Sequence, residues 1–219
     1  MSSVDEDGRF AGRGAVQRVR LLGIGGSTRQ GSKTLIALET ALALAREAGA
    51  EAVLADVRAL ALPVFDDDLP LAAYPATLPW LLDEARRVDA YLLASPTYHG
   101  TISGAVKNVL DALNFLGEGG GDYFGGKPVG LIAHGGSSAA NVLTALHHAT
   151  RALNGLTVPT VVAVPGSSID VERRDVTDLG ARNRLAALVG ETIDLAWRLR
   201  RPAAVPAEPW DTAAANGED

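Results

Sequence analysis

Apolar runs alternate with helical patterns along the chain, as expected for a parallel sheet covered by helices. Short, continuous apolar runs that end at turn-forming residues predict buried strands at 19–24, 52–55, 90–94, 129–133 and 158–164. The segments between and after them predict helices near 32–48, 78–88, 104–113, 139–153 and 179–199. Five βα units of this kind predict an α/β three-layer sandwich.

The loops after the first, third and fourth predicted strands hold the unusual residues. In open parallel sheets, ligands bind beyond the carboxyl ends of the strands, where the strand order reverses. We therefore expect these three loops to form the site.

The first of these loops, residues 25–34, reads Gly-Gly-Ser-Thr-Arg-Gln-Gly-Ser-Lys-Thr and joins a strand to a helix. Its glycines allow a close backbone approach, Ser27, Ser32 and Thr34 offer hydroxyl donors, and Arg29 supplies positive charge. The loop lacks the ending of a nucleotide-hydrolysing P-loop. It therefore predicts a site that anchors the ligand by a phosphate group, while the reaction takes place elsewhere on the ligand.

The other two loops offer backbone groups and helix ends. Residues 95–104 include Pro96, which holds Ser95 extended and stiffens the loop. Residues 134–138, His-Gly-Gly-Ser-Ser, precede a helix whose amino end would favour a ligand atom that becomes negative. For His134 itself, both a local hydrogen bond and a ligand contact remain open.

Composition narrows the class of protein. The chain has 219 residues, a net charge of −6 and no cysteine, which argues against nucleic acid and excludes disulfides and thiolate metal sites. No histidine and carboxylate spacing indicates a metal, and no apolar segment reaches the roughly 18 residues of a membrane span. The polar start predicts no secretory signal, so we expect a cytoplasmic protein. We predict a flexible segment at 1–17, one domain at 18–200 and a flexible tail at 201–219.

Three motifs together resemble those of a known family. They are residues 26–32, residues 96–100 with Ser103-Gly104 and Lys107-Asn108 through Asp111, and residues 125–129. In this order and spacing, over roughly 19–164, the chain resembles the NADPH-dependent FMN reductases, flavodoxin-like enzymes that include flavin, quinone, azo-dye and chromate reductases. The resemblance implies a five-stranded parallel sheet of order 2-1-3-4-5 with helices on both faces, bound FMN, and a homodimer or homotetramer.

The resemblance also assigns residues to the cofactor. It implies that Ser27, Arg29, Ser32 and Thr34 bind the FMN phosphate, that Pro96, Thr97, Tyr98 and His99 line the isoalloxazine ring, and that Gly135, Ser137 and Ser138 meet its pyrimidine edge. Thr34 departs from the family pattern, because many relatives have Asn there.

The implied reaction passes hydride from NADPH or NADH to FMN and then electrons to a small acceptor. The acceptor would be a flavin, a quinone, an azo compound or a similar molecule, and a flavin product could serve a partner monooxygenase. The protein needs no nucleophile, since the cofactors carry the chemistry. Tyr98 and His99 are the only candidates for a catalytic side chain near the ring.

Two other readings of function remain. A Rossmann dinucleotide site would use Gly23 and Gly25 with Asp56, but Thr28 replaces the third glycine of that motif, and Arg29 would have no role. A non-catalytic flavodoxin-like electron carrier or interaction module would bind FMN without NADPH chemistry.

Three further segments carry smaller predictions. The glycine-rich stretch 117–126, with two aromatic residues, is either a connector or a lid or dimer contact that borders the flavin, and we favour the second. Lys107 and Asp111, four residues apart, predict a solvated ion pair. Residues 172–175 predict a solvated loop.

Overall fold

The computed structural model describes residues 18–200. The predicted flexible segments 1–17 and 201–219 lie outside the described residues. The five long strands are β1 (Arg20–Gly25), β2 (Glu51–Asp56), β3 (Ala90–Tyr98), β5 (Pro128–His134) and β6 (Leu156–Val164). The helices are α1 (Lys33–Glu47), α2 (Val57–Leu60), α3 (Thr77–Arg87), α4 (Gly104–Ala112), α5 (Ala139–Ala152) and α6 (Leu179–Arg200). Within this range no helix has the length and apolar character needed to cross a membrane.

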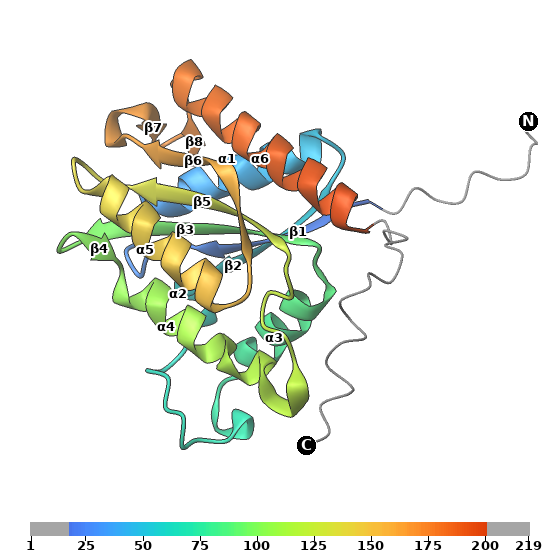
Figure 1. Ribbon diagram of the computed structural model, residues 1–219. Helices are drawn as coiled ribbons and strands as arrows, with labels where there is room; N and C mark the ends of the chain where they lie inside the picture. Colours follow the sequence, from blue (N-terminus) through green and yellow to red (C-terminus); the bar gives the residue numbers. More distant parts are fainter. Residues whose placement is uncertain (1–17, 201–219) are drawn as a thin grey trace, which may run out of the picture.

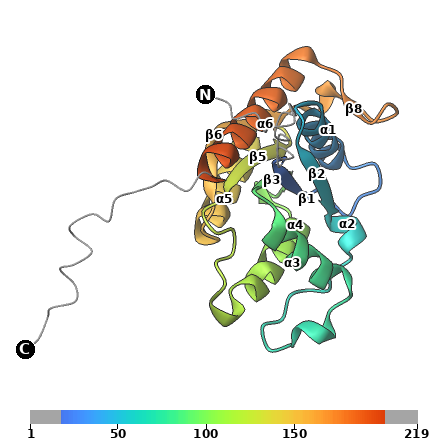
Figure 2. The ribbon, with the colours of Figure 1, turned by 90° about the vertical axis from the view of Figure 1, so that its right-hand side faces the viewer.

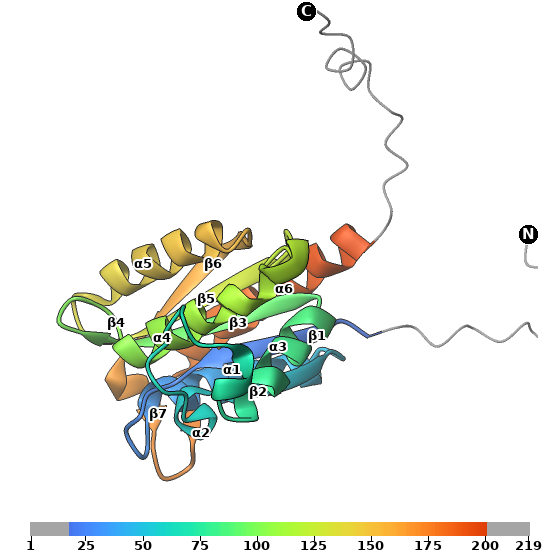
Figure 3. The ribbon, with the colours of Figure 1, turned by 90° about the horizontal axis from the view of Figure 1, so that it is seen from below.

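The sheet separates two hydrophobic cores, as the side-chain alternation of a strand requires. Leu22 and Leu93 face the core beneath α3, α4 and α5, while Leu21 and Leu92 face the core beneath α1 and α6. Figure 1 shows the layers, Figure 2 places α1 and α6 on one side of the sheet, and Figure 3 looks onto the other side. The predicted α/β flavodoxin-like fold with a parallel sheet is confirmed.

The strand order is β2-β1-β3-β5-β6, so the predicted order 2-1-3-4-5 is not exact. The sequence prediction missed β4 (Thr101–Ile102), which pairs antiparallel with the end of β3. His99 and Gly100 join the two strands with φ of +48° and +82°, as a two-residue hairpin turn requires. A strand of two residues is too short to leave a hydrophobic period in the sequence. The parallel strands themselves follow one another across the sheet as predicted.

A second small hairpin corrects the prediction for residues 172–175. These residues belong to the turn and second strand of a hairpin formed by β7 (Ile169–Asp170) and β8 (Asp175–Val176). Arg174 pairs with Glu39 of α1 at 2.6 Å. Asp175 accepts a hydrogen bond from Arg182 of α6 at 2.9 Å. The hairpin is therefore tied to two helices and is not a free loop.

The glycine-rich segment 117–126 lies at the wrong end of the sheet for a lid. It leads into the amino end of β5, opposite the loops that follow β1, β3 and β5 (Figure 1). Phe124 is fully buried and its ring centroid lies 4.2 Å from that of Tyr91. Lys127 donates to the carbonyl of Ala85 at 2.9 Å, near the carboxyl end of α3, and burial lowers the pKa of Lys127. The predicted lid at the cavity is wrong, and the aromatic residue Phe124 builds the core instead, while the dimer contact stays a prediction.

The edge strand β6 is irregular. Its register against β5 shifts between Val129 and Leu131, which leaves a bulge in β6. Pro159 lies in this bulge and has no N–H to donate. Glu191 of α6 accepts hydrogen bonds from the amide N–H and the hydroxyl of Thr160, at 2.8 and 2.6 Å. The two donors of Thr160 in the bulge are thus satisfied by a helix.

Candidate functional site

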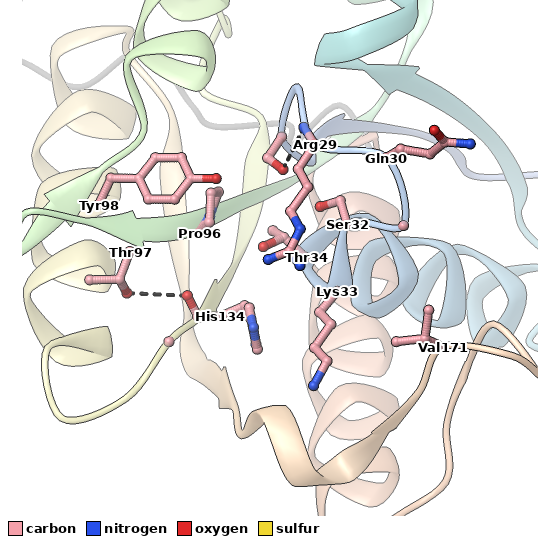
Figure 4. Close-up of a pocket in the computed structure, with 13 residues that line it drawn as sticks. Arg29, Gln30, Ser32, Lys33, Thr34, Pro96, Thr97, Tyr98, His134 and Val171 are labelled. Carbon is pink, nitrogen blue, oxygen red and sulfur yellow. Dashed lines mark hydrogen bonds between the residues drawn. The ribbon is translucent and has the colours of Figure 1, made fainter.

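A cavity of about 360 Å³ opens at the carboxyl ends of the central strands. This volume lies at the lower end of the range typical of small-molecule sites. Its lining contains no aspartate or glutamate, although the whole chain carries a net charge of −6. The lining residues are Ser27, Arg29, Gln30, Gly31, Ser32, Lys33, Thr34, Pro96, Thr97, Tyr98, His134, Gly135 and Val171 (Figure 4).

The loop between β1 and α1 forms one wall of the cavity. Ser32 caps α1, since its hydroxyl oxygen accepts a hydrogen bond from the amide of Leu35 at 3.2 Å. The hydroxyl oxygen of Ser27 accepts one from the amide of Arg29 at 3.3 Å. Both hydroxyl protons therefore remain available to donate. Gly26 has φ of +101°, a conformation that favours glycine and turns the chain away from β1.

Thr34 is the strongest sign that this wall binds an anion. Its side chain is 1% exposed, and its hydroxyl has no hydrogen-bond partner in the structure of residues 18–200. A buried hydroxyl without a partner costs free energy, so a water or a ligand oxygen is expected to meet it. Arg29 has no carboxylate within ion-pair distance among the described residues, and its side chain extends towards Thr34 (Figure 4). Two serines, Thr34, Arg29 and the amino end of α1 thus fit a phosphate.

The end of β3 forms the opposite wall. Pro96, Thr97 and Tyr98 continue the strand beyond the predicted end at residue 94 and line the cavity. Tyr98 is 46% exposed, so its ring offers an apolar surface beside an open space. This wall suits a flat, partly apolar ligand.

A hydrogen bond joins β3 to the loop after β5. Thr97 donates from its hydroxyl to the carbonyl of His134 at 3.1 Å. A Cβ on the next residue, Gly135, would lie 2.1 Å from the Thr97 hydroxyl oxygen. Gly135 is therefore needed for the two loops to approach each other.

We expect Gly135→Ala to lower the free energy of unfolding by about 1 to 3 kcal/mol, because the added methyl displaces Thr97. Gly136→Ala is the matched control, since a Cβ there meets no atom within 4 Å and the change should stay within about 0.5 kcal/mol. Urea unfolding followed by circular dichroism measures both. Equal losses in the two variants would contradict the role given to Gly135.

Three predicted contacts are not brought into the cavity. His99 lies in the turn between β3 and β4, Ser137 is exposed, and Ser138 is the residue before α5. None of the three lines the cavity. His99 lies beyond the end of β3, and Ser137 and Ser138 lie beyond Gly135, the last residue of its loop that lines the cavity.

Four side chains of the lining were not assigned from the sequence. Gln30 and Lys33 stand within the recognised loop, between the residues that were chosen. Val171 comes from the β7–β8 hairpin, which the sequence pattern did not predict. His134 makes the local hydrogen bond that was one of its two readings, to the carbonyl of Val164 at 3.0 Å, and it also lines the cavity.

Asp56, the residue on which a Rossmann reading depends, has a structural partner. Its carboxylate accepts a hydrogen bond from the amide of Arg58 at 3.0 Å and caps α2. Asp56 does not line the cavity. The geometry thus gives no support to a ribose contact from this carboxylate.

The chain matches a known family over most of the described residues. Residues 19–168 match the family model of NADPH-dependent FMN reductases. Among curated proteins, the chain is 42% identical over 88 residues to an FMN-dependent NADPH-azoreductase of Staphylococcus aureus (strain USA300). These 88 residues are 40% of this chain and 44% of the azoreductase, so less than half of that relative is spanned.

Solved structures show the same fold at lower identity. The flavoenzyme NAD(P)H:(acceptor) oxidoreductase FerB from Paracoccus denitrificans has a TM-score of 0.68 and 22% identity, over 82% of this chain and 98% of that chain. RosB, solved with 8-demethyl-8-formylriboflavin-5'-phosphate, has a TM-score of 0.64 and 20% identity, over 83% of this chain and 80% of that chain. An archaeal flavodoxin has a TM-score of 0.52 and 13% identity, over 84% and 100% of the two chains. At these identities the structures support the fold alone.

Proposed function

Since the chain belongs to the NADPH-dependent FMN reductase family, we propose that it binds FMN in the cavity and oxidises NAD(P)H to reduce a small acceptor. The observation that carries this proposal is the buried hydroxyl of Thr34, which lies beside Arg29 and the amino end of α1. Among residues 18–200, this hydroxyl has no hydrogen-bond partner and Arg29 has no ion pair. Those groups fit the FMN phosphate, and the wall of Pro96 and Tyr98 fits the ring. Bound FMN would supply the redox chemistry, by accepting hydride and passing electrons on.

The side chains and helix ends of the protein would bind FMN, orient it and polarise its ring. Ser27, Ser32 and Thr34 would donate hydroxyl protons to phosphate oxygens, and Arg29 would neutralise part of the phosphate charge. The amino end of α5, which begins four residues after Gly135, carries partial positive charge and would favour negative charge on the ring. No side chain of the lining needs to act as a nucleophile.

Tyr98 is the candidate catalytic side chain that the cavity retains. Of the two that were predicted, it lines the cavity and His99 does not. We propose that Tyr98 packs beside the ring, and that His99, Ser137 and Ser138 contact the ligand only if their loops adjust.

The test is a visible spectrum before and after anaerobic NADPH. We expect the FMN-loaded protein to lose its yellow absorbance within seconds to minutes of adding NADPH, much faster than free FMN mixed with NADPH in the same buffer. NADH is compared in parallel, because the donor preference is part of the proposal. If the loaded protein stays yellow with both donors, the electron-carrier reading replaces this one.

Two further proposals concern the electron acceptor and the oligomeric state. An azo compound is supported by the name of the Staphylococcus aureus relative, and flavins and quinones by the resemblance of the motifs. We also propose a cytoplasmic homodimer or homotetramer and, where the product is reduced flavin, a monooxygenase partner. Size-exclusion chromatography with light scattering measures the assembly.

A further inference from the structure

Lys33 contributes a positive charge that is not part of the proposed phosphate site at Arg29 and Thr34. It is the first residue of α1 and lines the cavity, but its side chain extends away from the loop that carries Arg29 (Figure 4). Its amine donates to the carbonyl of Gly166 at 2.9 Å. No carboxylate within residues 18–200 lies within ion-pair distance of this amine. Within residues 18–200, no carboxylate therefore neutralises the charge of Lys33.

His134 faces the same space as Lys33. Its Nδ1 must carry the proton, because it lies 3.0 Å from the carbonyl of Val164, which can only accept. The Lys33 amine and the His134 Cε1 lie 3.5 and 3.4 Å from one point, the position that a Cβ on Gly166 would take. The absence of a side chain at Gly166 thus keeps both groups accessible from one side.

The β7–β8 hairpin and the loop before α1 also contribute to the lining of the cavity. Val171 of the β7–β8 hairpin is 43% exposed, and its Cγ1 lies 3.8 Å from the position of a Cβ on Gly31. Gln30 also lines the cavity. An apolar and an amide side chain at the rim suit the flat, hydrogen-bonding surface of a nucleobase.

We propose that Lys33 forms a second phosphate subsite, and that the ligand which reaches it is a flavin adenine dinucleotide. The proposal rests on the proposed function, because the first phosphate must occupy the wall of Arg29 and Thr34. The adenosine diphosphate part of FAD continues from that phosphate, so its second phosphate meets the next cation along the lining and its adenine reaches the rim at Gln30 and Val171. A lining with two separate cations and no acid favours two linked phosphates over one.

The experiment compares FMN and FAD binding by flavin fluorescence titration in the wild type and in Lys33→Met. We expect the Kd for FAD to rise about tenfold, the loss of one charge-assisted contact, while the Kd for FMN stays within about twofold. Lys107→Met is the matched control, since this exposed lysine of α4 pairs with Asp111 and does not line the cavity, and neither Kd should change.

The other outcomes each overturn the proposal. Equal losses for FMN and FAD in Lys33→Met would place Lys33 in the first phosphate site. A raised KM for NADPH with an unchanged Kd for FAD would assign the subsite to the nicotinamide nucleotide. A wild type that binds FMN but not FAD would reject the subsite and leave the proposed function intact, whereas failure to bind either flavin would reject both.

Discussion

Arg29→Ala is expected to weaken FMN binding about 10- to 100-fold, while the apo fold keeps its stability. The guanidinium has no ion pair within the described chain, so its removal breaks no contact that holds the fold. It lines an acid-free cavity next to Thr34, where the phosphate would lose a charge-assisted hydrogen bond. FMN titration gives the affinity, and thermal unfolding without ligand gives the stability.

Two further variants sharpen the test of Arg29. Arg29→Lys keeps the charge but loses the planar fork, so its affinity should fall between those of the wild type and the alanine variant. Arg184→Ala removes an exposed arginine of α6 that does not line the cavity and should leave binding unchanged. An unchanged FMN affinity in Arg29→Ala would show that the phosphate binds elsewhere.

Gly25→Ala is expected to lower the free energy of unfolding by about 3 kcal/mol or more and to abolish high-affinity FMN binding. Gly25 pairs with Ala94 across β1 and β3, and a Cβ would lie 2.3 Å from the Ala94 carbonyl oxygen. Backbone of two central strands cannot move aside as a flexible side chain can. Because Gly25 leads into the phosphate loop, separating the strands would also displace Ser27 and Arg29.

Thermal unfolding measures the effect. In a chain of this size, a loss of about 3 kcal/mol corresponds to a fall in Tm of about 6 to 12 °C. Gly190→Ala is a control in which stability is expected to change in the opposite direction. Gly190 lies within α6 and a Cβ there meets nothing within 4 Å, so alanine should raise stability by up to about 1 kcal/mol. A Gly25→Ala variant as stable as the wild type would mean that β1 and β3 tolerate a wider spacing.

Hydrophobic periodicity was sufficient for the framework of the fold. The long elements start and end within a few residues of their predicted bounds, because the central strands β1, β3 and β5 are largely buried and each long helix has an apolar side. Elements of two to four residues were missed, among them α2, β4 and the β7–β8 hairpin. Their formation depends on turn conformation and on contacts with distant helices, such as the pair Arg174 and Glu39, which no local pattern records.

The residues of the candidate site also fall into those that sequence reasoning could find and those that it could not. Ser27, Arg29 and Thr34 were accessible to sequence reasoning, because a strand, a glycine-rich turn and a helix place them together along one short loop. Val171 was not, because it reaches the cavity from residues that lie almost 140 positions later in the chain. Segment 117–126 was misplaced for a different reason: its glycines and aromatic residues fit a lid, but its position before a strand puts it at the far edge of the sheet.

The bulge in β6 limits how copies of this chain can associate. An outermost strand normally offers a row of free amides that another chain can extend into a continuous sheet. Here Pro159 has no amide hydrogen and Glu191 occupies that of Thr160, so the row is interrupted at its middle. We therefore expect oligomers of this protein not to extend the sheet at β6, and the native fold to resist growth into fibrils from this strand.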